Sequence, residues 1–241
     1  CANPTANGPS MARKPRPADW EALLAHAEVP QTKVPGAVLI GGAAAALHAG
    51  HRISFDHDHV VRDLARNYDA AIARLESIVG WRSRRRIRGK LVLGGIHGID
   101  AGLRNLRRSA PLETTTVRLK GGGTLRIPTV EEMLRIKAFL AVERNATRDY
   151  LDVAALSHHL GMRKSAKALE RMGELYAEFA GEGGDIMVSL ATKLADPDPY
   201  DLTEVDLSEY KGIVAPWSDW RAVQKQCRAL AVALLGPALK A

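Results

Sequence analysis

Hydrophobic residues along the chain change their spacing near residue 130. Before this point short apolar runs alternate with glycine-rich turns, and residues 37–40 form one such run, typical of a buried strand, that ends at Gly41 and Gly42. After it, apolar residues recur every three or four positions, which is the period of an amphipathic helix. The pattern predicts an α+β fold in which a mixed β-sheet with flanking helices precedes a C-terminal helical bundle.

The boundary between the two patterns carries a helix-start signal. Thr129 followed by Glu132 forms a capping box, and Ser218 is a possible cap for the last helix. We therefore predict a first domain over 11–129 and a helical domain over 130–241. The predicted strands are 37–40, 53–61, 91–103 and 114–127, the last folded as a hairpin over Gly121, Gly122 and Gly123, and the predicted helices are 19–27, 43–49, 63–79, 130–144, 149–160, 165–180, 184–195 and 218–235.

Composition adds information about partners and setting. The chain has 241 residues, 46% apolar and 25% charged, and its net charge of +7 favours polyanions such as nucleic acid or nucleoside triphosphates. Only Cys1 and Cys227 occur, and no apolar run approaches the roughly 20 residues of a transmembrane helix, so we expect a cytoplasmic protein with no membrane partner. Residues 1–10 are uncharged and precede Met11, and we interpret them as an expression scar.

Two aspartates carry the main chemical signal. Asp56 and Asp58 are two residues apart in a predicted strand, so they face the same side as Ser54, while His57 and His59 face the other. Paired carboxylates can hold hard divalent cations such as Mg²⁺, which in turn bind triphosphate oxygens. The same pattern also arises by chance in turns, so its context decides between the two interpretations.

The glycine turn before this strand has two interpretations. Gly41 and Gly42 let the backbone approach a phosphate at the start of the next helix, where free amides and the helix dipole favour anions. They also fit an ordinary structural turn.

A third carboxylate, Asp100, lies between Ile99 and Ala101 in a predicted strand. A charge within an apolar run is costly unless it meets a cation, so we predict that Asp100 completes the metal site. The alternative is an edge-strand aspartate that faces water, which the surrounding glycines allow.

Lys137 lies on the apolar stripe of the helix that starts near residue 130, and Asp149 and Asp152 lie on the inward stripe of the next helix. Such a lysine either extends past the apolar face to solvent or binds an anion such as a triphosphate, and it can also pair with an inward aspartate. Residues 81–90, with Arg104, form a basic surface that either follows an RNA backbone or is simply solvated. Arg107 and Arg108 extend the same surface.

Taken in order, these motifs resemble one family. Gly41 and Gly42, residues 50–58 (GHRISFDHD), Lys137, Arg144 and residues 148–152 (RDYLD) resemble the AbiEii/MenT nucleotidyltransferase toxins of the DNA polymerase β-type superfamily, over roughly 36–160. The resemblance implies a nucleotidyltransferase-type sheet and a Mg²⁺-dependent toxin of a toxin–antitoxin pair. It further implies transfer of nucleotides from an NTP to RNA, typically the 3′ end of tRNA, which blocks translation, and a cognate antitoxin as partner.

The resemblance also implies residue roles. Asp56 and Asp58 correspond to metal ligands, Lys137 to the triphosphate-binding lysine and Asp149 to the acidic residue of the last motif. Substrate binding is assigned to the remaining motif residues, which are Gly41, Gly42, Arg52, Ser54, Arg144, Arg148 and Asp152. One departure is Ala43, where many relatives have serine after glycine, so a hydroxyl contact to phosphate is lost.

Two other functions remain open at this stage. The same fold could transfer a nucleotide or phosphate to a protein hydroxyl, on an antitoxin or on Ser54 itself, or it could be a catalytically silent RNA-binding module. In the first case the acceptor is a protein hydroxyl instead of RNA. In the second case the clustered aspartates have no catalytic role. The choice of NTP, the tRNA targets, the antitoxin's identity and the oligomeric state are not encoded in these motifs. In each case we expect the site in the cleft between the sheet and the helices.

Overall fold

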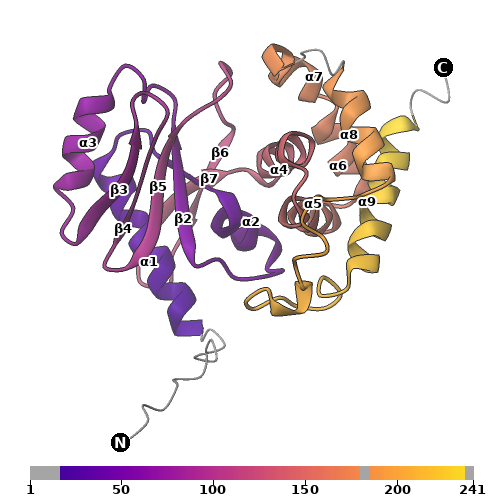
Figure 1. The fold of residues 1–241 in the computed structure, drawn as a ribbon, viewed down its shortest axis with the longest axis horizontal. Helices are drawn as coiled ribbons and strands as arrows, with labels where there is room; N and C mark the ends of the chain where they lie inside the picture. The colour runs from indigo at the N-terminus through magenta and orange to yellow at the C-terminus, as the bar shows by residue number, and fades with distance from the viewer. Residues whose placement is uncertain (1–16, 180–184, 237–241) are drawn as a thin grey trace, which may run out of the picture.

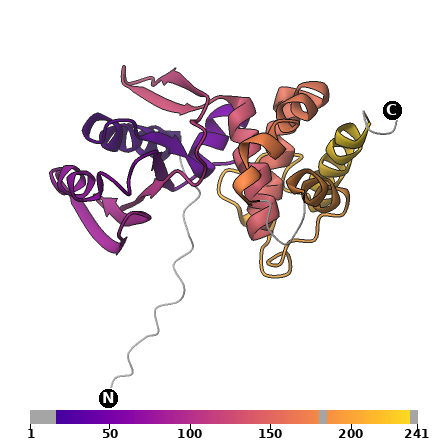
Figure 2. The same cartoon turned by 90° about the horizontal axis from the view of Figure 1, so that it is seen from above.

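The computed structural model describes residues 17–179 and 185–236, and it consists of a sheet-containing part and a helical part that lie side by side (Figures 1 and 2). The strands are β1 (Val38–Ile40), β2 (Asp56–Val61), β3 (Trp81–Ile87), β4 (Leu91–Ile96), β5 (Ile99–Asn105), β6 (Thr114–Arg118) and β7 (Thr124–Pro128). The helices are α1 (Pro17–Lys33), α2 (Gly41–Ala49), α3 (Tyr68–Glu76), α4 (Val130–Arg144), α5 (Thr147–Leu160), α6 (Met162–Leu169), α7 (Met172–Leu175), α8 (Ile186–Ala195) and α9 (Trp220–Leu235), with single 3₁₀ turns at Ala177–Phe179 and Leu207–Glu209. The predicted α+β class is confirmed.

A mixed five-stranded sheet forms the frame of the first part. Its order is β1-β2-β5-β4-β3, with β2 parallel to β5 and the other neighbours antiparallel. The predicted strand 91–103 is wrong in one respect, because His97 and Gly98 both adopt positive φ and turn the chain between β4 and β5. The basic stretch 81–90 contains β3, the edge strand of this sheet.

The strand that carries the aspartates is shorter than the predicted 53–61. It begins at Asp56, because the residues before it bond to a distant loop instead of to β1: the Ile53 amide donates to the Lys211 carbonyl (2.9 Å), and the Val214 amide donates to the His51 carbonyl (3.0 Å). A loop that precedes α9 is thereby tied to the entrance of β2.

The C-terminal helices agree with the predicted period, with local differences. The Thr129 cap is confirmed, since its side chain accepts a hydrogen bond from the Glu132 amide. The reciprocal half of the predicted capping box is wrong, because the Thr129 amide donates to the Glu113 carbonyl and the Glu132 carboxylate pairs with Arg108 and Arg135. Asp219, and not Ser218, caps α9 through its bond from the Arg221 amide. The predicted helix 165–180 is divided into α6 and α7, and its last residue lies outside the described part of the chain.

Two hydrophobic clusters form the core of the described residues. One packs α3 against β4 and β5, with Leu64, Leu75 and Leu103 among its members. The larger cluster joins α1 and α2 to the helices after residue 130, so apolar packing continues across the predicted domain boundary. His57 and His59 are buried on the sheet face opposite the aspartates, as alternation predicted, and burial lowers their pKa values to about 4 and about 3.

Candidate active site

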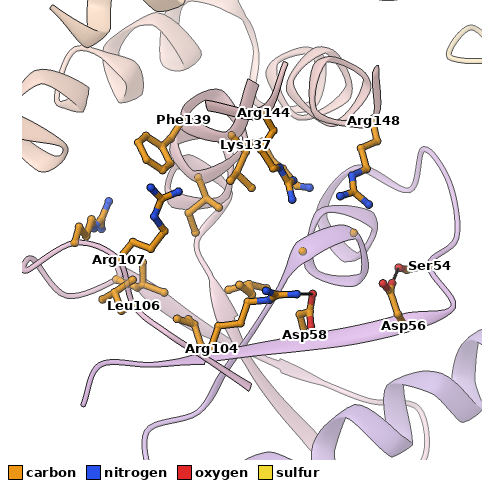
Figure 3. A pocket seen from close by; sticks show the side chains of 18 of the residues that line it. Ser54, Asp56, Asp58, Arg104, Leu106, Arg107, Lys137, Phe139, Arg144 and Arg148 are labelled. Carbon is orange, nitrogen blue, oxygen red and sulfur yellow. Dashed lines mark hydrogen bonds and ion pairs between the residues drawn. The ribbon is translucent and has the colours of Figure 1, made fainter. Parts of the chain in front are cut away.

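The carboxylates of Asp56 and Asp58 lie on the face of β2 that looks toward the helices (Figure 3). Ser54 Oγ donates a hydrogen bond to Asp56 Oδ1 at 2.7 Å, whereas within residues 17–179 and 185–236 the ion-pair partner of Asp58 is Arg104, with Nη2 at 3.5 Å. Burial raises the pKa of Asp58, Arg104 opposes this effect and the neighbouring charge of Asp56 adds to it. A half-buried carboxylate beside a second carboxylate is electrostatically poised to bind a cation.

Gly102 on β5 makes room for Asp58. The two residues are register partners, and a Cβ at position 102 would lie 2.1 Å from Asp58 Oδ1. Any other residue here would therefore displace the carboxylate or the strand.

The glycine turn places a helix start beside the aspartates. Gly41 has φ +78°, and α2 begins there with no side-chain cap, so its first backbone amides are left to solvent or a ligand. A Cβ at Gly42 would lie 2.7 Å from Arg52 Nη2 and 3.0 Å from Ser54 Oγ. The absence of a side chain at Gly42 thus lets Arg52 and Ser54 pack against the turn, and phosphate binding at the turn stays a prediction. Ala43 is buried in the core, away from the turn surface.

Asp152 binds two of the predicted substrate-binding cations. Its carboxylate is fully buried and accepts bonds from Arg52 Nε (2.8 Å) and Nη2 (3.0 Å), while Lys137 Nζ lies at 2.6 Å. His51 Nε2 lies at 2.8 Å from the same group. Burial alone raises the pKa of Asp152, but the charges of Arg52 and Lys137 and the His51 hydrogen bond hold it well below the usual value. The alternative in which the inward lysine and aspartate pair is confirmed.

Asp149 has the same kind of environment. It is fully buried, bonds to Arg144 Nη2 (2.8 Å) and Nε (3.1 Å), and lies 3.4 Å from Lys137 Nζ. Neither Asp149 nor Asp152 lines the cleft; both lie behind the cations that do. Both carboxylates are therefore placed to hold the cleft cations in position: Asp149 holds Arg144, and Asp152 holds Arg52 and Lys137.

A cleft of about 580 Å³ joins these groups. It lies between β2, β5 and α4, and most of the predicted residues line it: Gly41, Gly42, Arg52, Ser54, Asp56, Asp58, Lys137, Arg144 and Arg148. Among the described residues Arg148 makes no hydrogen bond or ion pair, although it points into the cleft (Figure 3). It is thus available to an anionic ligand.

Asp100 differs from its prediction. The premise of a buried charge is wrong, because its side chain is 59% exposed and forms an ion pair with Arg84 at 2.7 Å. It is nevertheless the register partner of Asp56 on the neighbouring parallel strand, and the two line a second, more open cavity. Its role as a metal ligand stays a prediction.

Several cleft residues were not predicted. Tyr210, from the loop tied to β2, has its ring 5.9 Å from the Arg52 guanidinium. Phe139 and Tyr176 line the far end of the cleft. Their sequence signal was only that of core aromatics, since nothing in helical spacing distinguishes a cleft wall from a core.

Half of the six basic side chains in the stretch 81–90 form ion pairs within the protein. Arg84 pairs with Asp100, Arg86 with Glu76 and Arg88 with Asp69, and all three arginines are exposed. The structure therefore agrees with a solvated charged strand, and RNA binding at this surface stays a prediction.

The oxygen donors of the aspartate pair fit a hard divalent cation. Residues 17–179 and 185–236 contain no cluster of three or more His, Cys, Asp or Glu side chains that could hold a metal ion alone. A cation at Asp56 and Asp58 would therefore complete its coordination with water or substrate oxygens, as Mg²⁺ commonly does.

Comparison with known sequences gives partial matches. No protein-family model matches the chain. It is 36% identical over 146 residues to the heme uptake protein MmpL11 of Mycobacterium tuberculosis, which covers 59% of this chain and 14% of that protein. It is 34% identical over 130 residues to the mycolic acid-containing lipids exporter MmpL11 of Mycolicibacterium smegmatis, covering 54% and 13%. The chain thus spans a small fraction of these relatives. In its described part every helix is too short or too polar to cross a bilayer.

Comparison with solved structures extends over most of the chain. MenT4, a nucleotidyltransferase toxin from Mycobacterium tuberculosis H37Rv, superposes with a TM-score of 0.53 at 15% identity over 89% of this chain and 82% of that chain. The structure of JHP933 from Helicobacter pylori gives 0.50 at 17% identity over 92% and 93%. With its mixed sheet, flanking helices and following helical part, the protein has the nucleotidyltransferase fold.

Proposed function

We propose that the protein is a MenT-type nucleotidyltransferase toxin that uses a divalent cation to transfer nucleotides from an NTP to the 3′ end of tRNA. One observation carries the proposal: Asp56 and Asp58 face the uncapped start of α2 and the free guanidinium of Arg148 across a single cleft. The fold shared with the toxin MenT4 supports it. A cognate antitoxin is the corresponding partner.

The chain's own groups divide the work by position. Asp56 and Asp58 would hold Mg²⁺, with Asp100 as a third candidate ligand. A bound cation would neutralise charge on the triphosphate and stabilise the negative charge that develops on the acceptor oxygen as its proton is lost. Because that neutralisation and the in-line placement of the groups are most of what such transfers need, the protein's task is chiefly to position them.

Phosphate binding falls to the groups around the glycine turn. The first amides of α2 and the guanidinium of Arg148 can donate to phosphate oxygens, and Ser54 fixes the orientation of Asp56. Lys137 lines the cleft beside them, held by Asp152, so its ammonium adds positive charge at a fixed place.

The acceptor is the finer part of the proposal. A net charge of +7 favours a polyanion such as tRNA over a neutral acceptor. Ser54 is a poor acceptor, because the residue is only 5% exposed and its hydroxyl already donates to Asp56.

The test is incubation with each labelled NTP, Mg²⁺ and total tRNA. Wild type should extend tRNA at its 3′ end, Asp58→Asn should not, and Asp196→Asn, an exposed aspartate outside both cavities, should behave as wild type. Equal labelling by wild type and Asp58→Asn, or labelling by neither, would contradict the proposal. Mass spectrometry of the same reactions decides the acceptor, since nucleotide found on protein and not on RNA would exclude tRNA.

A further inference from the structure

The cleft has an apolar end beyond the aspartates. We define it by its lining residues, Leu106, Leu112, Ile136, Phe139, Leu140 and Tyr176. Leu106, Ile136 and Leu140 are only half-buried, so they present aliphatic surface to the cleft. Figure 3 shows Phe139 and Leu106 at one end, with Ser54 and Asp56 at the other. A cleft with cations and a metal-binding carboxylate pair at one end and apolar side chains at the other fits a ligand with an anionic part and an apolar part.

Arg107 covers this apolar end. Its guanidinium lies 5.1 Å from the Phe139 ring centroid and 4.8 Å from that of Phe179, and Nη2 donates to Glu143 Oε2 at 2.9 Å. The Arg107 side chain is 54% exposed, and exposed ion pairs are weak. The guanidinium can therefore exchange these contacts for a flat ligand, and a guanidinium plane stacks readily on a nucleobase.

The spacing of the two ends also fits a nucleotide. Asp58 is the register partner of Gly102, and Leu106 follows four residues later, about 13 Å along the strand at ~3.3 Å per residue. If phosphates bind at the start of α2 and over the aspartates, the ribose lies near Arg104 and Lys137, which line the middle of the cleft. The base then reaches the apolar end.

From these contacts we infer that the apolar end is a nucleobase site, which takes the base of the donor NTP under a movable Arg107. The inference rests on the proposed function and adds to it a position for the base. Arg107 thereby becomes a residue that sets affinity for the donor.

The test compares binding of NTPs with binding of inorganic tripolyphosphate, which has no base, by calorimetry with Mg²⁺. Ile136→Trp fills the apolar end and should weaken NTP binding about tenfold while tripolyphosphate binds as to wild type. Arg107→Ala, at an exposed position, should weaken NTP binding about threefold. Arg82→Ala, on the edge strand β3, is the matched control and should change neither. Thermal unfolding shows whether each variant is folded. If Ile136→Trp does not fold, the comparison of NTP with tripolyphosphate binding is made with Arg107→Ala alone.

The outcomes separate this inference from the function on which it rests. Equal loss of both ligands, or unchanged NTP binding in folded Ile136→Trp and Arg107→Ala, overturns the base site. If these variants lose affinity for a short RNA with an unpaired 3′ end but not for NTPs, the base belongs to the acceptor and the donor assignment is wrong. Base-dependent NTP binding without any tRNA labelling overturns the proposed function alone.

Discussion

Lys137 and Asp152 form a buried ion pair across two helices, with Nζ of the lysine 2.6 Å from Oδ2 of the aspartate. The same carboxylate accepts hydrogen bonds from Nε and Nη2, which form one edge of the Arg52 guanidinium. One side chain of α5 therefore fixes two cations that line the cleft, one from α4 and one from the loop before β2. Removing it would leave both cations without their main partner.

Asp152→Ala should lower the free energy of unfolding by about 3–5 kcal/mol, because buried charges lose their counter-charge. Chemical denaturation measures this value. The matched control is Asp196→Ala, whose carboxylate is 84% exposed and pairs with Arg228 at 3.2 Å, and it should cost no more than about 0.5 kcal/mol. Similar losses for the two variants would contradict the assignment of Asp152 as the buried counter-charge.

The pH dependence of stability should report the same group. The pKa of Asp152 is held well below its usual value, so its ionised form stabilises the folded protein at pH values above the unfolded pKa of about 3.9. This stabilisation is lost as pH falls from that value through the folded pKa. The difference in unfolding free energy between wild type and Asp152→Asn should therefore be constant from about pH 5 to 7 and shrink below about pH 4. A difference in unfolding free energy that stays unchanged below about pH 4 would contradict a lowered pKa of Asp152 in the folded protein.

Asp58→Asn should raise the free energy of unfolding, whereas Asp152→Ala should lower it. Burial raises the pKa of Asp58, so its charge destabilises the folded, metal-free protein at neutral pH. We expect the variant to gain on the order of 1 kcal/mol at pH 7 in the absence of divalent cations. The gain should shrink as pH falls through the folded pKa and vanish below the unfolded value of about 3.9, where the Asp58 carboxyl is neutral in both the folded and the unfolded chain.

Differential scanning calorimetry with a chelator measures this gain, and the tRNA-labelling assay should show at least a hundredfold loss of activity. Asp196→Asn, whose carboxylate is 84% exposed and lies outside both cavities, is the control and should change neither the metal-free stability by more than about 0.5 kcal/mol nor the activity. If metal-free Asp58→Asn is less stable than wild type at pH 7, then the Asp58 charge does not destabilise the folded protein.

Arg148 and Arg144 should separate binding from stability. Arg148 makes no hydrogen bond or ion pair within the described residues, so Arg148→Ala should change the unfolding free energy by no more than about 0.5 kcal/mol and raise KM for the NTP about tenfold. Arg144 bonds twice to buried Asp149, so Arg144→Ala should cost about 2 kcal/mol of stability or more. Steady-state kinetics and thermal unfolding of both variants test this difference. An Arg148→Ala protein that unfolds at a lower temperature than Arg144→Ala would contradict it.

The fold was largely predictable because its periodic segments are long. The helices after Thr129 follow a 3.6-residue pattern, and the Thr129 cap places the first of them correctly. The errors occur where distant segments decide local structure. The loop at residues 211–214 takes the hydrogen bonds of residues 51–53, so β2 starts late. No local pattern encodes that pairing.

The site was predictable where residue type and alternation suffice, as for Ser54, Asp56 and Asp58. It was not predictable where burial decides. Asp100 has apolar neighbours in sequence, but its side chain lies at the open end of the sheet beside Arg84, so neighbours gave the wrong environment. Asp149 and Asp152 were correctly expected to face inward, but their position behind the cations depends on how α4 and α5 pack.

The missing side chain at Gly102 has a genetic consequence. Asp58 Oδ1 occupies the space in which a Cβ at position 102 would lie. The size of the residue at position 102 on β5 therefore determines where the Asp58 carboxylate on β2 can lie. A residue with no reactive group is then as indispensable as those that react. In a selection for loss of function, substitutions at Gly102 should be recovered as readily as substitutions at Asp58, and they should yield folded protein that the cell still accumulates.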